Sequence, residues 1–250
     1  MLTSVLESGV SVGPYPELAG KRILITGLNL EAGVDIARAF AEQGCRIVLH
    51  TMASGTEADA VLEMLAQTAS ELQVYSDPLT DVETTTKFAQ TAARTFSGLD
   101  AVINLVHADL GTITAEAADC DIESGIARCL QNAQLITRIA ANRMRLTWSE
   151  GLILNVLVAT PPMTGAAGLM LGITRSMLAS MTRAEAQQWA DQAIRINAIA
   201  PSIDDVDACE RLASEPDIAL LAMFLASPRG RDFSGMVFDT AQAGNPREAA

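Results

Sequence analysis

The side chains that could bind a metal or form disulfides are few and widely spaced. Neither His50 nor His107 has a second ligand-type residue at metal-binding spacing, and each ends an apolar run, as strand-end residues do. No two cysteines have CxxC spacing; the four are Cys45, Cys120, Cys129 and Cys209. We therefore expect no metal site, and reduced thiols in a cytoplasmic protein.

Seven short apolar runs alternate with helical patterns along the chain. The first run, 22–26, precedes a helix predicted at 31–43 by the spacing of Val34, Ile36 and Phe40. Further strands are predicted at 46–50, 73–76, 100–106, 151–158, 194–199 and 236–239, with helices from 56 and at 81–96, 122–144, 164–190 and 216–226. This alternation predicts an α/β fold: a doubly wound parallel sheet of about seven strands, with helices on both faces.

The 250 residues fit a single domain. We expect an irregular N-terminal extension at 1–19, the domain at 20–244 and a polar tail at 245–250. The first twenty residues lack the basic and continuous apolar regions of a signal peptide, and no apolar run reaches membrane-spanning length. A formal charge of −13 repels phosphates, so neither nucleic acid nor a membrane is an expected partner.

A series of segments from residue 18 to 240 resembles the short-chain dehydrogenase/reductase (SDR) family. The stretch LAGKRILITGLNLEAGVDIARAFAEQGCRIVL has the layout of the family's first βαβ unit, and DAVINLVH, ILNV, IRINAIAP and SGMVFD follow in the family's order. Each segment alone is weak, but their order and spacing over the whole length are specific. The resemblance implies a Rossmann-type single domain and an oxidoreductase that uses NAD(P).

The cofactor loop departs from the family's TGxxxGxG pattern. Gly27 and Gly33 are retained, but Glu31 replaces the middle glycine, and its charge would repel a nearby phosphate by about 3–4 kcal/mol at an effective dielectric of 20. Alternatively, Glu31 is an ordinary acid in a first helical turn, or its side chain rotates outward. We expect no cofactor or only weak NAD(P)(H) binding, at a vestigial site formed by Gly27, Asn29, Glu31, Gly33, Thr51 and Asn104.

The resemblance also implies four catalytic positions, none of which holds the family's residue. The tyrosine and lysine positions are Leu171 and Arg175, the serine position is Val158, and the asparagine position is Cys129. The chain's only tyrosines and lysines are Tyr15, Tyr75, Lys21 and Lys87, so no shift of alignment restores the pair. Leucine has no ionisable proton, so hydride transfer by the family's mechanism is not expected.

Three functions are compatible with this pattern. The first is a pseudoenzyme subunit of a homo-oligomer, or of a heteromer with an active SDR paralogue, assembled through helices 122–146 and 165–190. Small residues every four positions favour helix contact there, although they would equally suit packing on the sheet; they are Gly168, Gly172, Ser176 and Ser180. The alternatives are an atypical oxidoreductase that uses Thr160, Thr164, Arg175 or His107, and a sensor of a nucleotide or small metabolite.

Overall fold

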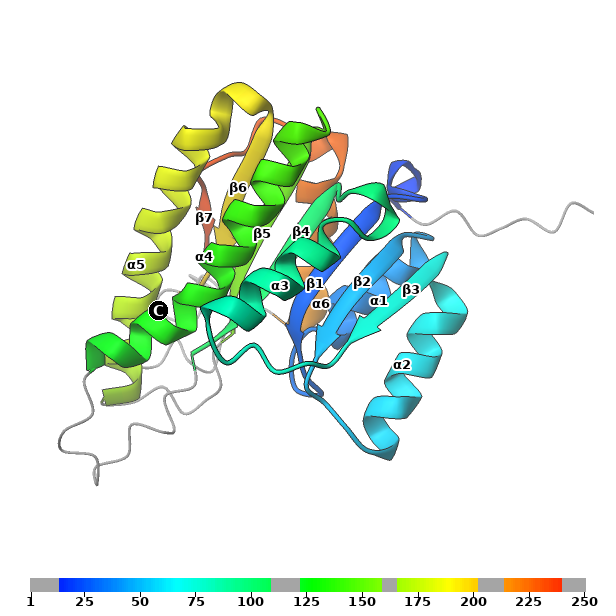
Figure 1. Ribbon diagram of the computed structural model, residues 1–250, viewed down its shortest axis with the longest axis horizontal. Coiled ribbons are helices and arrows are strands. Elements are labelled where there is room, and N and C mark those ends of the chain that lie inside the picture. The colour runs from blue at the N-terminus through cyan, green and yellow to red at the C-terminus, as the bar shows by residue number, and fades with distance from the viewer. Residues whose placement is uncertain (1–13, 109–121, 159–165, 202–213, 240–250) are drawn as a thin grey trace, which may run out of the picture.

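The computed structural model describes residues 14–108, 122–158, 166–201 and 214–239, except for the side chains of 122–125, 128–129 and 166–167. Within these ranges, seven parallel strands form one sheet in the order β3-β2-β1-β4-β5-β6-β7 (Figure 1). The predicted doubly wound Rossmann-type fold is therefore confirmed. The strands are β1 (Arg22–Leu28), β2 (Arg46–Thr51), β3 (Glu71–Tyr75), β4 (Ala101–His107), β5 (Gly151–Val158), β6 (Ile194–Ile199) and β7 (Val237–Phe238).

Helices cover both faces of this sheet. The face shown in Figure 1 is covered by α3 (Val82–Ala92), α4 (Ile122–Leu146) and α5 (Ala166–Trp189). The opposite face packs against α1 (Val34–Glu42), α2 (Thr56–Thr68) and α6 (Glu215–Ala226). The strand order therefore reverses direction between β1 and β4, and the connecting helices change from one face of the sheet to the other. Ligands bind at this position in open α/β sheets.

Alternate residues of the strands point to opposite faces of the sheet and are buried against the helices there. Leu24, Val102 and Ile153 point to the α3–α5 face, whereas Ile23, Ile103 and Leu154 point to the α1–α6 face. All six are at most 1% exposed. Burial on both faces explains why the strands are continuous apolar runs rather than alternating ones.

The predicted boundaries differ from the observed ones at several ends. The helix predicted from residue 31 begins at Val34, and the last strand is only Val237–Phe238. Near the N-terminus, Pro16–Leu18 forms a 3-10 turn whose Leu18 is buried in the core. The predicted extents of the domain and the two terminal segments stay predictions.

Within the described ranges, no helix has the length and apolarity needed to cross a membrane. The same part of the chain contains no cluster of three or more potential metal-binding side chains. Cys45 is buried, and its thiol donates to the Leu18 carbonyl at 3.2 Å. Burial, followed by the charge of Asp100, raises the pKa of Cys45 to about 12, so this thiol is unreactive at neutral pH.

Candidate cofactor loop and active site

The loop after β1 is built around two glycines with positive φ angles. Gly27 has φ of 79° and Gly33 has φ of 98°, a region that other residues rarely adopt. A Cβ at Gly33 would lie 2.3 Å from Leu105 Cδ1, and one at Gly27 would lie 2.6 Å from the Leu105 carbonyl oxygen. Both positions therefore require glycine, because β4 approaches the loop at Leu105.

Asn29 closes this loop into a tight turn. Its side-chain Oδ1 accepts hydrogen bonds from the amides of Glu31 and Ala32, at 3.0 and 2.7 Å. These bonds hold residues 29–32 outside the helix, and this explains why α1 begins three residues later than predicted. Glu31 is exposed in this turn, before the first helical residue.

The carboxylate at the start of α1 comes from Glu215, the first residue of α6. Its Oε1 accepts from the amides of Gly33 and Asp35, each at 2.8 Å, and from the amide of Ile36 at 3.4 Å. Gly33 is the N-cap residue and has no side chain to satisfy these donors. Glu215 therefore caps α1, although it lies about 180 residues later in the sequence. It is the site residue that the sequence analysis missed.

Two predicted cofactor residues hold backbone or core groups. Thr51 is buried, and its hydroxyl donates to the Leu28 carbonyl at 2.8 Å. Asn104 is buried between β1 and β5, where its Oδ1 accepts from the Thr26 hydroxyl at 3.0 Å and its Nδ2 donates to Asn155 Oδ1 at 2.8 Å. Both side chains thus fix the carboxyl ends of the strands that border the loop.

His107 joins the end of β4 to the same loop. Its Nε2 donates to the Gly27 carbonyl at 2.5 Å, which requires the proton to be on Nε2. In the register of β4 and β5, His107 pairs with Val158, so the structure brings one candidate substitute residue beside the predicted serine position. Thr160 and Thr164 lie outside the described residues.

The predicted tyrosine position lies inside an apolar cluster. Leu171 is 1% exposed and packs in the core formed with Val106, Leu157 and Leu178. One helical turn later, Arg175 Nη2 lies 3.5 Å from Asp239 Oδ2. Cys129 is on α4, but its side chain is outside the described part of the structure.

A comparison with protein families identifies the chain. The model of the family described as short chain dehydrogenase matches residues 21–217, which is most of the chain. The chain belongs to the short-chain dehydrogenase family.

Similar proteins are spread across bacteria. An uncharacterized oxidoreductase of Mycobacterium tuberculosis is 25% identical, over 89% of this chain and 91% of its own length. A 3-oxoacyl-(acyl-carrier-protein) reductase of Synechocystis is 22% identical, over 82% of this chain and 83% of its own length. Among solved structures, a hydroxysteroid dehydrogenase from Escherichia coli superimposes with a TM-score of 0.71 at 21% identity, over 91% of this chain and 98% of that one, and shows the shared fold.

Membership of the short-chain dehydrogenase family corrects the cofactor prediction. The expectation of no cofactor or only weak NAD(P)(H) binding is wrong, because a member of this dehydrogenase family is expected to bind a nicotinamide dinucleotide. The loop fits such a ligand, since the amides at the α1 N-terminus already bind a carboxylate as a stand-in anion. When bound, NAD(P)(H) supplies hydride chemistry; Gly27, Gly33 and these amides would hold its pyrophosphate.

The structure places the chain's tyrosines and lysines on elements other than α5. Tyr75 ends β3, the outermost strand, where its ring packs edge-on against Phe88. Lys87 lies on α3, while Tyr15 and Lys21 precede β1. All four therefore belong to elements on the opposite side of β4 from α5.

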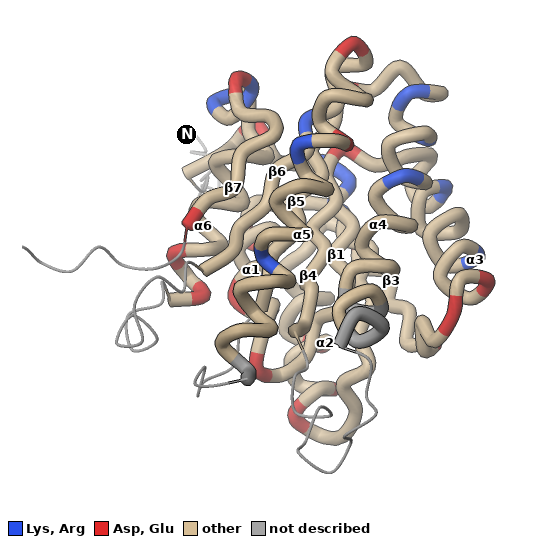
Figure 2. Tube along the Cα trace, turned by 90° about the vertical axis from the view of Figure 1, so that its left-hand side faces the viewer, with Lys and Arg blue, Asp and Glu red and all other residues tan. Residues whose placement is uncertain are grey.

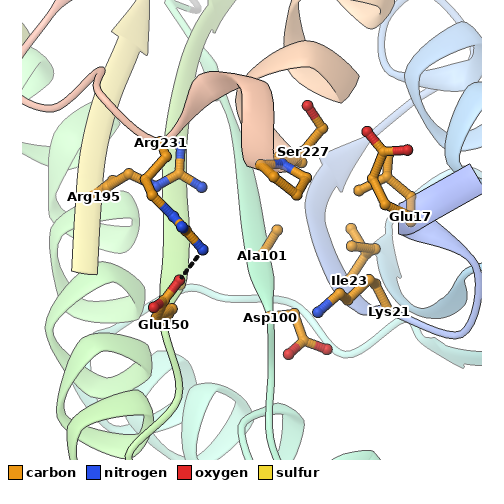
Figure 3. Close-up of a pocket in the computed structure, with 13 residues that line it drawn as sticks. Glu17, Lys21, Ile23, Asp100, Ala101, Glu150, Arg195, Ser227 and Arg231 are labelled. Atoms are coloured by element: carbon orange, nitrogen blue, oxygen red, sulfur yellow. Dashed lines mark hydrogen bonds and ion pairs between the residues drawn. The ribbon is translucent and has the colours of Figure 1, made fainter. Parts of the chain in front are cut away.

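A separate pocket lies at the amino ends of the strands (Figure 3). It has a volume of about 110 Å³, and Asp100, Glu150, Arg195 and Arg231 are among its lining residues. Arg231 pairs with Glu150 at 3.0 Å, and Arg195 donates to the carbonyls of Leu225 and Gly230, each at 2.7 Å. These charged groups already have partners, and they lie at the amino ends of the strands, whereas the loop follows the carboxyl end of β1, so this pocket is no part of the cofactor site.

Proposed function

We propose that this chain is a non-catalytic subunit of an oligomeric short-chain dehydrogenase, with a loop that accepts a dinucleotide but no acid–base group on α5. The proposal rests mainly on Leu171. Because this residue is buried in an apolar cluster, the position assigned to the family's tyrosine offers no transferable proton. Arg175 is ion-paired with Asp239, and a guanidinium does not serve as the general acid or base that this position would need.

An exposed apolar stripe on α5 supports the proposed assembly. Leu169, Ile173 and Met177 are 64%, 37% and 43% exposed, and their four-residue spacing places them on one side of the helix. The small residues differ in placement: Gly168 is buried, Gly172 is half-buried with open space beside its Cα, and Ser176 and Ser180 are exposed. Figure 2 shows that α5 is largely free of charged residues, as the core of a subunit contact requires.

The experiment is a hydride-transfer assay combined with native mass spectrometry. The purified chain is incubated with NADH or NADPH and a panel of ketones and 3-oxoacyl thioesters, and absorbance at the nicotinamide band is followed. We expect no turnover above the rate without protein, together with an oligomeric mass. Turnover, or a strictly monomeric mass, would contradict the proposal.

An active oxidoreductase is the second candidate, favoured by relatives that are named as reductases and dehydrogenases. For this candidate His107 is the substitute residue that contacts the loop, where its Nε2 donates to the Gly27 carbonyl. If turnover is found, His107→Gln and Arg175→Gln identify the group involved. Loss of turnover in either variant would support this candidate.

A further inference from the structure

The amides at the N-terminus of α1 are bound to an anion that belongs to the chain itself. Glu215 Oε1 accepts from three amides, those of Gly33, Asp35 and Ile36. Charge-assisted bonds of this kind are about twice as strong as neutral ones. Glu215 is only partly buried, so its side chain has a route out of this position.

The same amides are the groups that a pyrophosphate would need. The first turn of a helix offers only a few free N–H groups, and they face one point in space. A phosphate oxygen and the Glu215 carboxylate cannot both accept from them, and the two negative charges repel each other at such a short separation. Occupancy of the α1 N-terminus is therefore exclusive.

We infer that Glu215 is a displaceable internal occupant of the dinucleotide loop, so that the cofactor's pyrophosphate and the Glu215 carboxylate bind the α1 N-terminus in alternation. Dinucleotide binding is then coupled to the amino end of α6. This inference goes beyond the proposed function, because it holds whether or not the chain transfers hydride.

The structure allows Glu215 to leave without unfolding α6. The neighbouring Ser214 hydroxyl donates to Asp217 Oδ2 at 2.7 Å, which ties the first turn of α6 independently of Glu215. The buried face of the helix, formed by Ala219, Ala222, Met223 and Leu225, anchors the remainder in the core. Release therefore needs only a change of the Glu215 side chain and its first turn.

The test compares ligands with and without phosphates. Wild type, Glu215→Gln and Glu215→Ala are titrated by calorimetry with NADH, ADP and adenosine. The matched control is Asp217→Asn, which removes one charge two residues away on the same helix. We expect Glu215→Ala to bind NADH and ADP about tenfold or more tightly, because the carboxylate that competes for the amides is removed.

The other measurements separate competition from general effects. Glu215→Gln should show a smaller gain, because its amide oxygen still accepts but has no charge, and Asp217→Asn should stay within about twofold of wild type. Adenosine should bind all four proteins equally. If loss of the α1 cap unfolds Glu215→Ala, Glu215→Gln alone decides the comparison.

Three results would overturn the inference: unchanged affinity for NADH and ADP in the Glu215 variants, an equal gain for adenosine, or an equal gain in Asp217→Asn. Absence of measurable binding of NADH and ADP to every variant would also overturn it. Hydride transfer by wild type would refute the proposed function but leave this comparison intact, so the two failures are distinguishable.

Discussion

Arg22 and Asp100 form a two-point ion pair across the amino ends of the neighbouring strands β1 and β4. Arg22 Nε lies 2.8 Å from Asp100 Oδ2, and its Nη2 lies 2.8 Å from Oδ1. The Arg22 amide also donates to Oδ2, at 2.9 Å. The pair therefore fixes both the side chains and the backbone where the two central strands begin.

Loss of this pair is expected to weaken the fold in acid. Burial favours the neutral acid, but hydrogen bonds and charge from Arg22 outweigh it, so the pKa of Asp100 is lowered from 3.8. Because the folded pKa is below the unfolded one, the pair's contribution is present above the unfolded pKa and is lost as the pH falls through the folded value. Urea unfolding of wild type and Asp100→Asn across this acid range measures the contribution.

In Asp100→Asn, the free energy of unfolding should fall less steeply at acid pH than in wild type; we call this decline the acid limb. Arg22→Gln is the matched second variant, because it keeps the carboxyl group but removes the charge that lowers its pKa. Burial then favours the neutral acid, so the loss of stability in acid should shrink or reverse in this variant as well. Identical acid limbs in all three proteins would show that Asp100 does not govern this transition.

His50 predicts a second, separate pH range. The ring is 4% exposed, its Nε2 donates to the Asp77 carbonyl at 2.9 Å, and its buried Nδ1 has no partner in the described structure. Burial lowers the pKa of His50 from 6.5 although Asp77 opposes the shift. Since the unfolded chain protonates first, stability falls as the pH drops below 6.5 towards the lower folded pKa.

An NMR titration of the imidazole checks this expectation directly. The His50 signal should titrate at a lower pH than the signal of a free histidine does. In His50→Gln, the decline of unfolding free energy just below pH 6.5 should diminish. A His50 signal that titrates at or above 6.5 would contradict the role assigned to burial.

Leu171 and Leu169 offer a comparison of core and surface on one helix. Leu171 is 1% exposed and Leu169 is 64% exposed. Leu171→Ala should lower the free energy of unfolding by about 2–5 kcal/mol, because it leaves a cavity in the cluster with Leu178. Leu169→Ala should change the free energy of unfolding by less than about 0.5 kcal/mol, measured by the same chemical denaturation. Equal losses of unfolding free energy in the two variants would show that Leu171 is not a core residue.

The sequence predicts the fold well because the signals for it are local. A strand buried on both faces is a short apolar run, and a helix on the sheet has apolar residues at regular spacing, so β1, α1 and β2 can be recognised from 22–51 alone. The predicted helix start at 31 fails because the side chain of Asn29 binds the amides of the next residues. Composition alone does not show that competition.

The site is harder to predict because its contacts are distant in sequence. Glu31 was the expected source of negative charge at this loop, but the carboxylate that binds the amides at the N-terminus of α1 is that of Glu215, on α6. An acid at the start of a helix is ordinary, and nothing near Glu215 in the sequence indicates that α6 lies beside α1. Asn104 and Thr51 likewise match family positions, while their partners across β1 and β5 become known only in the folded chain.

The exposed stripe on α5 predicts how the proposed oligomer should respond to a charge. Met177 is 43% exposed between Ile173 and the next turn of the helix, so Met177→Glu would place a carboxylate in the proposed contact. Burying an unpaired charge costs several kcal/mol, and we expect the oligomer to dissociate at micromolar concentration. Met52→Glu is the matched control, since Met52 is 56% exposed just after β2, far from α5 in the sheet order. Sedimentation velocity measures both, and an oligomer that survives Met177→Glu unchanged would place the subunit contact elsewhere on the molecule.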